Sequence, residues 1–269
     1  MYDYEKIKDN LSTGYAGQTF VQFEDLLSVH AKAKNISENC PSGMLVLTQR
    51  QEDIKLKNSK IWYSKLIEGI FMSVIFKNSG KHDYSSQAVQ IATAAVCESI
   101  LQLDDKINCC IKWPNDVYVN DKKICSVFSE KILKKDNDSL IISIYINLSD
   151  NNEEDSKNLK KTTLFDVFGD EINKESIISN ILNRIEIYYD ELIETKKLKS
   201  SLVIFRNYNC ILGKTIGVKI INKKTVRKVE AIDINSFGEI EIIDNNKAKG
   251  LLKYGQDIIE WWTDEQAEN

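Results

Sequence analysis

The chain has 269 residues and a mass of 30.9 kDa, which suffices for one large domain or for a large domain with a small one. Its net charge is −4 and its pI is near 5.5, so no global positive field attracts nucleic acid or an anionic membrane. No apolar run approaches the ~18 residues of a membrane helix, and the polar start MYDYEKIKDN does not resemble a signal peptide. We therefore expect a cytoplasmic protein without nucleic-acid or membrane partners.

Motifs for metal or nucleophile chemistry are sparse. The six cysteines are scattered without a CxxC pair, and the chain has two histidines, His30 and His82. Thiolate zinc sites need close ligand pairs, and neither histidine stands in a recognisable nucleophile motif. We interpret the cysteines as small core residues.

The first part of the chain alternates between strand and helix patterns. Strand-like apolar runs occupy 43–49, 69–76, 108–113 and 139–148. Apolar residues recur at helical spacing over 85–103 and 174–194, so both segments are predicted helices. The polar stretch 149–161 is predicted to be an exposed loop.

A different pattern follows Arg206. Short strand-like runs separated by Asn, Lys and Gly turns alternate in period two, which predicts a small antiparallel barrel or sandwich. We place a domain boundary near residue 211. The predicted fold is therefore α+β, with a mixed sheet and helices on one side over residues 1–210 and an all-β domain over 211–269.

The segment 112–130, KWPNDVYVNDKKICSVFSE, is the most informative one for chemistry. Proline cannot donate to a strand ladder, so Pro114 ends a strand and a turn follows it. The dipeptide Asn120-Asp121 between YV and KI indicates a hairpin. A charged hairpin on a lysine-rich surface fits this pattern, and so does a site for an anionic ligand with Mg²⁺. The four residues predicted to meet at one edge of the sheet are Lys112, Asn115, Asp116 and Lys123.

The run Lys-Trp-Pro-Asn-Asp at 112–116, followed by Lys123, closely resembles the signature of biotin protein ligases. Residues 17–35 resemble the family's entry strand and first helix, and 51–62 falls where its nucleotide loop lies. Residues 162–169 resemble the segment after its sheet, and 211–262 resemble its small C-terminal β-domain, which implies an SH3-like fold there.

The resemblance implies a two-step ligase reaction. ATP and biotin condense to biotinyl-5′-AMP with loss of pyrophosphate, and a lysine of a biotin carboxyl carrier protein then attacks this anhydride. Lys123 would contact the biotin carboxylate and the α-phosphate as negative charge develops there. Asp116 would accept the proton of the incoming lysine, and Lys112 completes the expected catalytic set.

The resemblance also implies which residues hold the ligands. The expected biotin contacts are Ser28, Gln51, Lys55, Lys57 and Lys123. The expected ATP contacts are Lys57, Lys60, Trp62, Asn115 and Asn147. Asn115 and Asp116 are expected to help hold Mg²⁺, and Arg206 falls near an arginine that links the two domains in the family.

The sequence departs from the family in the ligand loop. The family's Gly-Arg-Gly-Arg-x-x-Gly-Arg-x-Trp stands here as residues 54–62, IKLKNSKIW, without glycine or arginine. Lysine lacks the planar fork of arginine, and glycine permits positive φ, so this loop must run differently. Larger side chains also replace glycine at Ser126 and in the strand 143–147.

Three functions remain open from the sequence. The first is a biotin–protein ligase that begins at its catalytic domain, because residues 1–20 are too short for a helix-turn-helix. The second is a relative that binds biotin or the carrier without making the adenylate, which the glycine-free loop favours. The third is a lipoate-type ligase, and the sequence motif KWPND argues against it. The resemblance also implies that the chain can form a homodimer.

Overall fold

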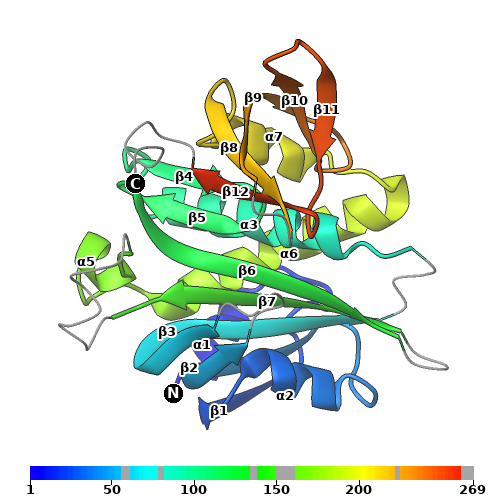
Figure 1. The fold of residues 1–269 in the computed structure, drawn as a ribbon. Helices are drawn as coiled ribbons and strands as arrows, with labels where there is room; N and C mark the ends of the chain where they lie inside the picture. Colours follow the sequence, from blue (N-terminus) through cyan, green and yellow to red (C-terminus); the bar gives the residue numbers. More distant parts are fainter. Residues whose placement is uncertain (56–60, 78–81, 134–137, 150–160, 222–224, 262–269) are drawn as a thin grey trace.

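The computed structural model describes residues 1–55, 61–77, 82–133, 138–149, 161–221 and 225–261, with the backbone alone at 52–55, 61–67 and 261. Its larger part is built on a seven-stranded mixed sheet, and a five-stranded antiparallel sheet follows in sequence (Figure 1). The α+β architecture predicted from the sequence is confirmed. No helix in the described ranges is long and apolar enough to cross a membrane.

The large sheet has the strand order β1-β2-β3-β7-β6-β5-β4. Strands β1 and β2 run parallel, and the other neighbouring strands of this sheet are antiparallel. The predicted strands all lie within it, although β2 and β3 are longer than their apolar runs. The bounds are β1 (Phe20–Leu26), β2 (Met44–Lys55), β3 (Ile61–Lys77), β4 (Cys109–Lys112), β5 (Asp116–Val119), β6 (Lys122–Ile132) and β7 (Ser139–Asn147).

Helices cover both faces of this sheet, whereas the sequence analysis expected them on one side. Alternate residues of β2 enter two different cores: Leu45 and Leu47 join the larger one, whereas Met44 and Val46 join the smaller one. Helices α3 (Ser85–Leu101) and α6 (Lys174–Thr195) pack on the larger core and cross behind the sheet in Figure 1. Helix α2 (Val29–Ile36) lies on the opposite face, which we call the α2 face.

The two predicted helices form for the reasons that their sequences give. Helix α6 begins at the N-cap Asn173, whose side chain accepts from the Ser176 amide, and it ends at Lys196 in a left-handed conformation. Helix α3 is buried almost all round because α6 and the sheet enclose it. Three further helices escaped sequence analysis: α1 (Tyr4–Asp9), α5 (Leu164–Phe168) and α7 (Ser200–Asn207). All three are eight residues or shorter, too short for a periodic signal.

The second sheet has the strand order β11-β10-β9-β8-β12 and stands above β4 and β5 in Figure 1. Its strands are β8 (Thr215–Ile220), β9 (Arg227–Ile234), β10 (Ile240–Asp244), β11 (Lys249–Leu252) and β12 (Asp257–Trp261), as the period-two pattern predicted. The Nη2 atom of Arg206 on α7 donates to the Ile234 carbonyl at the end of β9, at a distance of 2.6 Å. This arginine therefore joins the two parts of the chain.

Candidate functional site

The hairpin of β5 and β6 builds the central part of the site. Asn120 and Asp121 connect the two strands, and both have positive φ, at 50° and 62°. Two such residues make the type I′ turn that suits the twist of paired strands, and Asn and Asp tolerate this conformation. The hairpin predicted from this dipeptide is confirmed.

A β-bulge in β6 decides which face Lys123 occupies. Asp116 pairs with Ser126 and Val117 with Cys125, but Tyr118 pairs with Lys123, so Ile124 is one extra residue on β6. Ile124 and Cys125 both enter the larger core. The bulge thereby turns Lys123 to the α2 face, which Asp116 also occupies.

Asp116 is held by two side chains on this face. Its Oδ2 lies 2.7 Å from the Lys123 ammonium, and its Oδ1 accepts from the Ser126 hydroxyl at 2.5 Å. The Lys123 and Asp116 side chains are only 18% and 15% exposed, so solvent screens this pair weakly. In a preformed charge pair of this kind, Lys123 can bind an anion and Asp116 can accept a proton from a donor.

The other two residues of the predicted cluster lie beside this pair. Lys112 is the register partner of Asp116 across β4 and β5. Asn115 donates from Nδ2 to the Val127 carbonyl at 2.9 Å, so its amide extends the ladder beyond the end of β5. The prediction that these residues lie close together is confirmed, but they do not share one edge of the sheet, because Lys123 is on β6, two strands in from the edge strand β4.

Asn147, another predicted site residue, reaches the same region from β7. Its Nδ2 donates to the Thr162 carbonyl at 3.2 Å, and the Thr162 amide donates to the Lys123 carbonyl at 3.0 Å. Asn147 is buried, and its register partner on β3 is Gly69. The 161–162 segment thus connects Asn147 with Lys123.

Ser28 and Gln51 form a second group at the start of α2. Leu26 is the parallel register partner of Gln51, so the chain leaving β1 passes beside Gln51 before α2 begins. The Gln51 Oε1 accepts from the Val29 amide at 2.5 Å, and the N-cap Ser28 accepts from the Ala31 amide. Strands lie ~4.8 Å apart, so three strand spacings put this group about 14 Å from the backbone of β6. An elongated ligand across the strands would span the two groups.

Large side chains lie on the α2 face between the Ser28–Gln51 group and the Lys123–Asp116 pair. Tyr145 stands between Ser126 and Phe71 in one register row, and it is fully buried. Among the residues that the structure describes, none gives the Tyr145 hydroxyl a hydrogen bond of good geometry, which is a costly arrangement for a buried polar group. The expected bulk in strand 143–147 is therefore confirmed, and it occupies the middle of this face.

His30 on α2 makes a polar network that sequence analysis missed. Its Nδ1 lies 2.8 Å from the Ser143 hydroxyl and its Nε2 lies 2.9 Å from the Glu130 carboxylate, which also pairs with Lys34. Burial lowers the pKa of His30, and the smaller raising effect of Glu130 does not compensate. A neutral ring that donates to Glu130 from Nε2 and accepts from Ser143 at Nδ1 fits both contacts. A lone histidine in an amphipathic helix carries no signal that foretells these partners.

The structure corrects the extent of the predicted ligand loop. Residues 51–62 were expected to form one loop, but β2 continues to Lys55 and β3 begins at Ile61, with Lys55 paired to Ile61. Lys55 and Trp62 therefore belong to strands, because strand pairing continues past the end of the apolar runs. The side chains of Lys55 and Trp62 lie outside the described residues, and so do Lys57 and Lys60 entirely.

The donor set does not favour a magnesium ion held by the protein. Within the described ranges no three His, Cys, Asp or Glu side chains group as metal ligands. Both Asp116 oxygens already have partners, and the Asn115 amide nitrogen donates to a carbonyl. Mg²⁺ prefers near-octahedral oxygen ligands and keeps several waters, so it fits better here as part of a bound nucleotide.

A groove of about 650 Å³ runs from the motif along β6. Its walls come from Lys112, Asn115 and Asp116, from Ser85 at the start of α3, and from Tyr254 and Asp257 of the second sheet. This volume is typical of a small-molecule site. Asp116 is thus one of the residues that line this groove.

Comparisons with known proteins identify relatives of this chain. Residues 31–148 match the model of the Biotin/lipoate A/B protein ligase family. The bifunctional ligase/repressor BirA of Bacillus spizizenii is 27% identical over 233 residues, which cover 85% of this chain and 71% of that protein. The biotin protein ligase of Aquifex aeolicus, solved with biotin and ATP, superposes with a TM-score of 0.72 at 19% identity, over 90% of this chain and 98% of its own.

A third relative is more distant. The biotin protein ligase of Leishmania major, solved with biotinyl-5-AMP, superposes with a TM-score of 0.57 at 18% identity. The match covers 88% of this chain and 99% of that one. At such identities the superpositions establish the fold.

Proposed function

We propose, from the premise that this chain belongs to the Biotin/lipoate A/B protein ligase family, that it is an ATP-dependent biotin–protein ligase. In this proposal biotin and Mg·ATP form biotinyl-5′-AMP and release pyrophosphate. The ε-amino group of a lysine on a biotin carboxyl carrier protein then attacks the acyl carbon, and AMP leaves. The products are an amide on the carrier and free AMP.

The observation that carries the proposal is the pair of Lys123 and Asp116 on the α2 face. An ammonium at this place would stabilise the negative charge that develops between the biotin carboxylate and the α-phosphate. Once a ligand anion engages Lys123, the Asp116 carboxylate is free to accept the proton of the attacking lysine. Lys112, its register partner, would add positive charge beside the nucleotide.

The two side-chain groups on the α2 face suggest how the substrates lie. Ser28 and Gln51 would hold biotin at the α2 end, and Lys123 would meet its carboxylate at the other end. Asn115 and Asn147 would contact the nucleotide beside the motif. The expected contacts of Lys55, Lys57, Lys60 and Trp62 stay part of this proposal as predictions from the sequence.

A second candidate function rests on Tyr145. Its ring fills the middle of the α2 face between Ser126 and Phe71, where an elongated ligand would otherwise lie against the sheet. This bulk favours a relative that takes another acid, such as lipoate, or that binds without forming the adenylate. The fold and the Lys123–Asp116 pair are common to all these candidates.

Mass spectrometry of the protein incubated with Mg·ATP and biotin tests the proposal, with lipoate as the parallel substrate. Biotinyl-AMP together with released pyrophosphate supports the ligase, whereas lipoyl-AMP in its place supports the second candidate. Biotin binding by calorimetry without any adenylate indicates a binding protein. Absence of both adenylates and of binding contradicts the whole proposal.

The proposal includes the partner and the compartment. Its macromolecular substrate is the biotin carboxyl carrier protein or domain of a biotin-dependent carboxylase, and a homodimer is its proposed assembly. All six cysteines are free thiols, which is typical of the reducing cytoplasm. Transfer of biotin to an added carrier domain, followed by intact-mass analysis, tests the second half of the reaction.

A further inference from the structure

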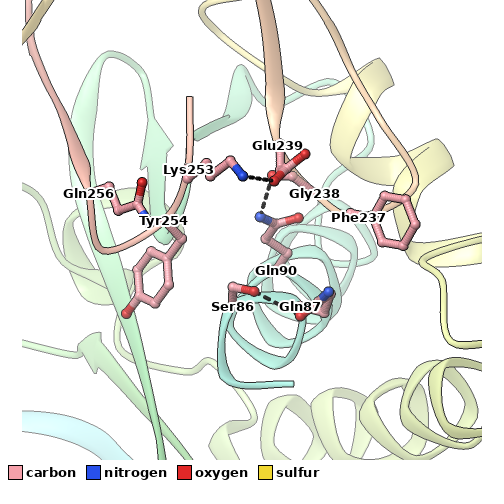
Figure 2. Close-up of a pocket in the computed structure, with 9 residues that line it drawn as sticks. All are labelled: Ser86, Gln87, Gln90, Phe237, Gly238, Glu239, Lys253, Tyr254 and Gln256. Carbon is pink, nitrogen blue, oxygen red and sulfur yellow. Dashed lines mark hydrogen bonds and ion pairs between the residues drawn. The ribbon is translucent and has the colours of Figure 1, made fainter. Parts of the chain in front are cut away.

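One backbone carbonyl of the second sheet meets two buried donors of the large domain. The Gly238 carbonyl accepts from Gln90 Nε2 at 2.7 Å and from Trp113 Nε1 at 2.9 Å. The Gln90 and Trp113 side chains are each 1% exposed. Trp113 belongs to the KWPND motif and Gln90 to α3, so this carbonyl joins three elements that are distant in sequence. Figure 2 shows Gln90 reaching from α3 toward Gly238.

The turn that presents this carbonyl is firmly held. The Asn235 side chain accepts from the amides of Phe237 and Glu239 and donates to the Glu239 carboxylate, which pairs with Lys253. Gly238 has φ +81°, and a Cβ atom there would overlap the Gln90 amide. The turn therefore requires glycine both for its conformation and for its close approach to α3.

The second sheet also approaches the motif beside this turn. A pocket of about 320 Å³ separates Phe237 from Tyr254 and has Gln90 in its wall (Figure 2). Tyr254 lines this pocket and the groove that contains Asp116. Burial, and to a smaller extent the charge of Asp116, raise the pKa of Tyr254 to about 12. The second sheet thus adjoins the motif both at Trp113 and near Asp116.

We propose that the 235–239 turn is a positioning element for the ligase reaction, with Gly238 fixing the Trp113 indole and thereby the Asn115–Asp116 segment that follows it. The inference rests on the proposed function. We assign Trp113, Gln90 and Gly238 the role of positioning residues, and Trp113 is also part of the wall of the groove. Trp113 precedes Asp116 by three residues, so a shift of its ring moves the carboxylate that pairs with Lys123. Misplacement by about 1 Å can slow a reaction up to 10²-fold.

The first test separates the indole N–H from the bulk of the ring. Trp113→Phe keeps an aromatic ring in the core and removes the bond to Gly238. We expect kcat of adenylate formation to fall about tenfold or more, within the range that misplacement produces. The KM values for biotin and ATP should stay within about twofold of the wild type, because phenylalanine keeps an aromatic side chain in this wall of the groove. A residue that only stabilises the fold would instead lower the melting temperature and leave kcat of the folded enzyme unchanged.

A second test uses the close approach of Gly238 to Gln90. Gly238→Ala should lower kcat more than Trp113→Phe does, and Gln90→Ala in the same chain should restore part of it by making room for the added Cβ. The matched control is Gly213→Ala, because Gly213 has a similar φ of +74° but no neighbour within 4 Å of the added Cβ. We expect this control to retain wild-type kcat.

Hydrogen exchange at the backbone amides of residues 112–118, except Pro114, which has no N–H, provides a test that does not depend on activity. Faster exchange in Trp113→Phe and Gly238→Ala, but not in Gly213→Ala, supports the positioning element even if the wild type makes no adenylate and the proposed function fails. Unchanged exchange and unchanged kcat in the first two variants overturn it. So does a double variant no more active than Gly238→Ala, or an equal loss of kcat in Gly213→Ala.

Discussion

The Lys123 ammonium lies 2.7 Å from the Asp116 carboxylate because one extra residue in β6, Ile124, turns Lys123 to the face of the sheet that Asp116 occupies. Without this bulge the period-two alternation of the strand would place Lys123 on the face of the larger core. The most specific chemical feature of the site therefore depends on a local irregularity of the backbone. The bulge also buries Ile124 and Cys125 side by side in that core.

Lys123→Ala should abolish measurable adenylate formation, with a fall of at least about 10²-fold, because the positive charge that stabilises the developing anion is removed. Pyrophosphate release with biotin and Mg·ATP measures the effect. Lys122→Ala is the matched control, since Lys122 is the preceding lysine of the same strand and is exposed. Full turnover by Lys123→Ala would remove this lysine from the mechanism.

Asp116→Asn should slow transfer to the carrier more than it slows adenylate formation. The amide keeps the shape of the carboxylate and can accept from Ser126, but it is a poor base for the incoming lysine. We expect transfer from preformed adenylate to fall about 10²-fold in single-turnover experiments, with adenylate accumulating. Asp121→Asn, in the exposed hairpin turn, should transfer at the wild-type rate. An unaltered transfer rate in Asp116→Asn would exclude Asp116 as the base.

Much of this site could be predicted because its signals are local. Pro114 ends a strand, and Asn120-Asp121 forms a turn for reasons contained in the residues themselves. The apolar run that predicted β7 and the helical spacing that predicted α3 are equally local, since β7 is buried along its whole length and α3 along most of it. Segments buried in this way consist largely of apolar residues, which the sequence shows directly.

The features that escaped prediction depend on distant partners. His30 is defined by Ser143 and Glu130, more than ninety residues away. The Gly238 carbonyl meets Trp113 across 125 residues. Residues 49–55 are mostly polar and residues 61–68 mix apolar with charged residues, so no regular alternation marked these paired segments as strands. Tertiary contacts of this range leave no mark in a single sequence.

His30 makes the stability of the fold depend on pH near neutrality. Its pKa is lowered from the ordinary value of 6.5 by burial, so the unfolded chain binds a proton that the native chain does not. The contribution of neutral His30 to the free energy of unfolding is therefore fully present above pH 6.5. This free energy should fall as the pH drops below 6.5, by at most about 1.4 kcal/mol per pH unit.

Urea unfolding at pH 7.5, 6.5 and 5.5 measures this dependence, and His30→Gln should flatten it. His82→Gln is the control, because His82 is exposed and is the other histidine of the chain. The carboxylate of Glu130 adds an effect of the same sign at lower pH. Burial raises its pKa, but the hydrogen bonds from His30 and Lys34 outweigh this and lower it below 4.5. An unchanged pH dependence in His30→Gln would contradict the assignment.

Tyr145→Phe should stabilise the protein without ligand, by about 1 kcal/mol, because it keeps the ring and removes a buried hydroxyl that no described residue pairs with in good geometry. For a chain of this size the melting temperature should rise by about 2–4 °C. Tyr188→Phe is the matched comparison, since the Tyr188 hydroxyl donates to Glu98 and its removal should destabilise by about 1 kcal/mol. A Tyr145→Phe variant less stable than the wild type would show that the hydroxyl has a partner. Weaker binding of biotin or lipoate by this variant, at higher stability, would identify the partner as the ligand.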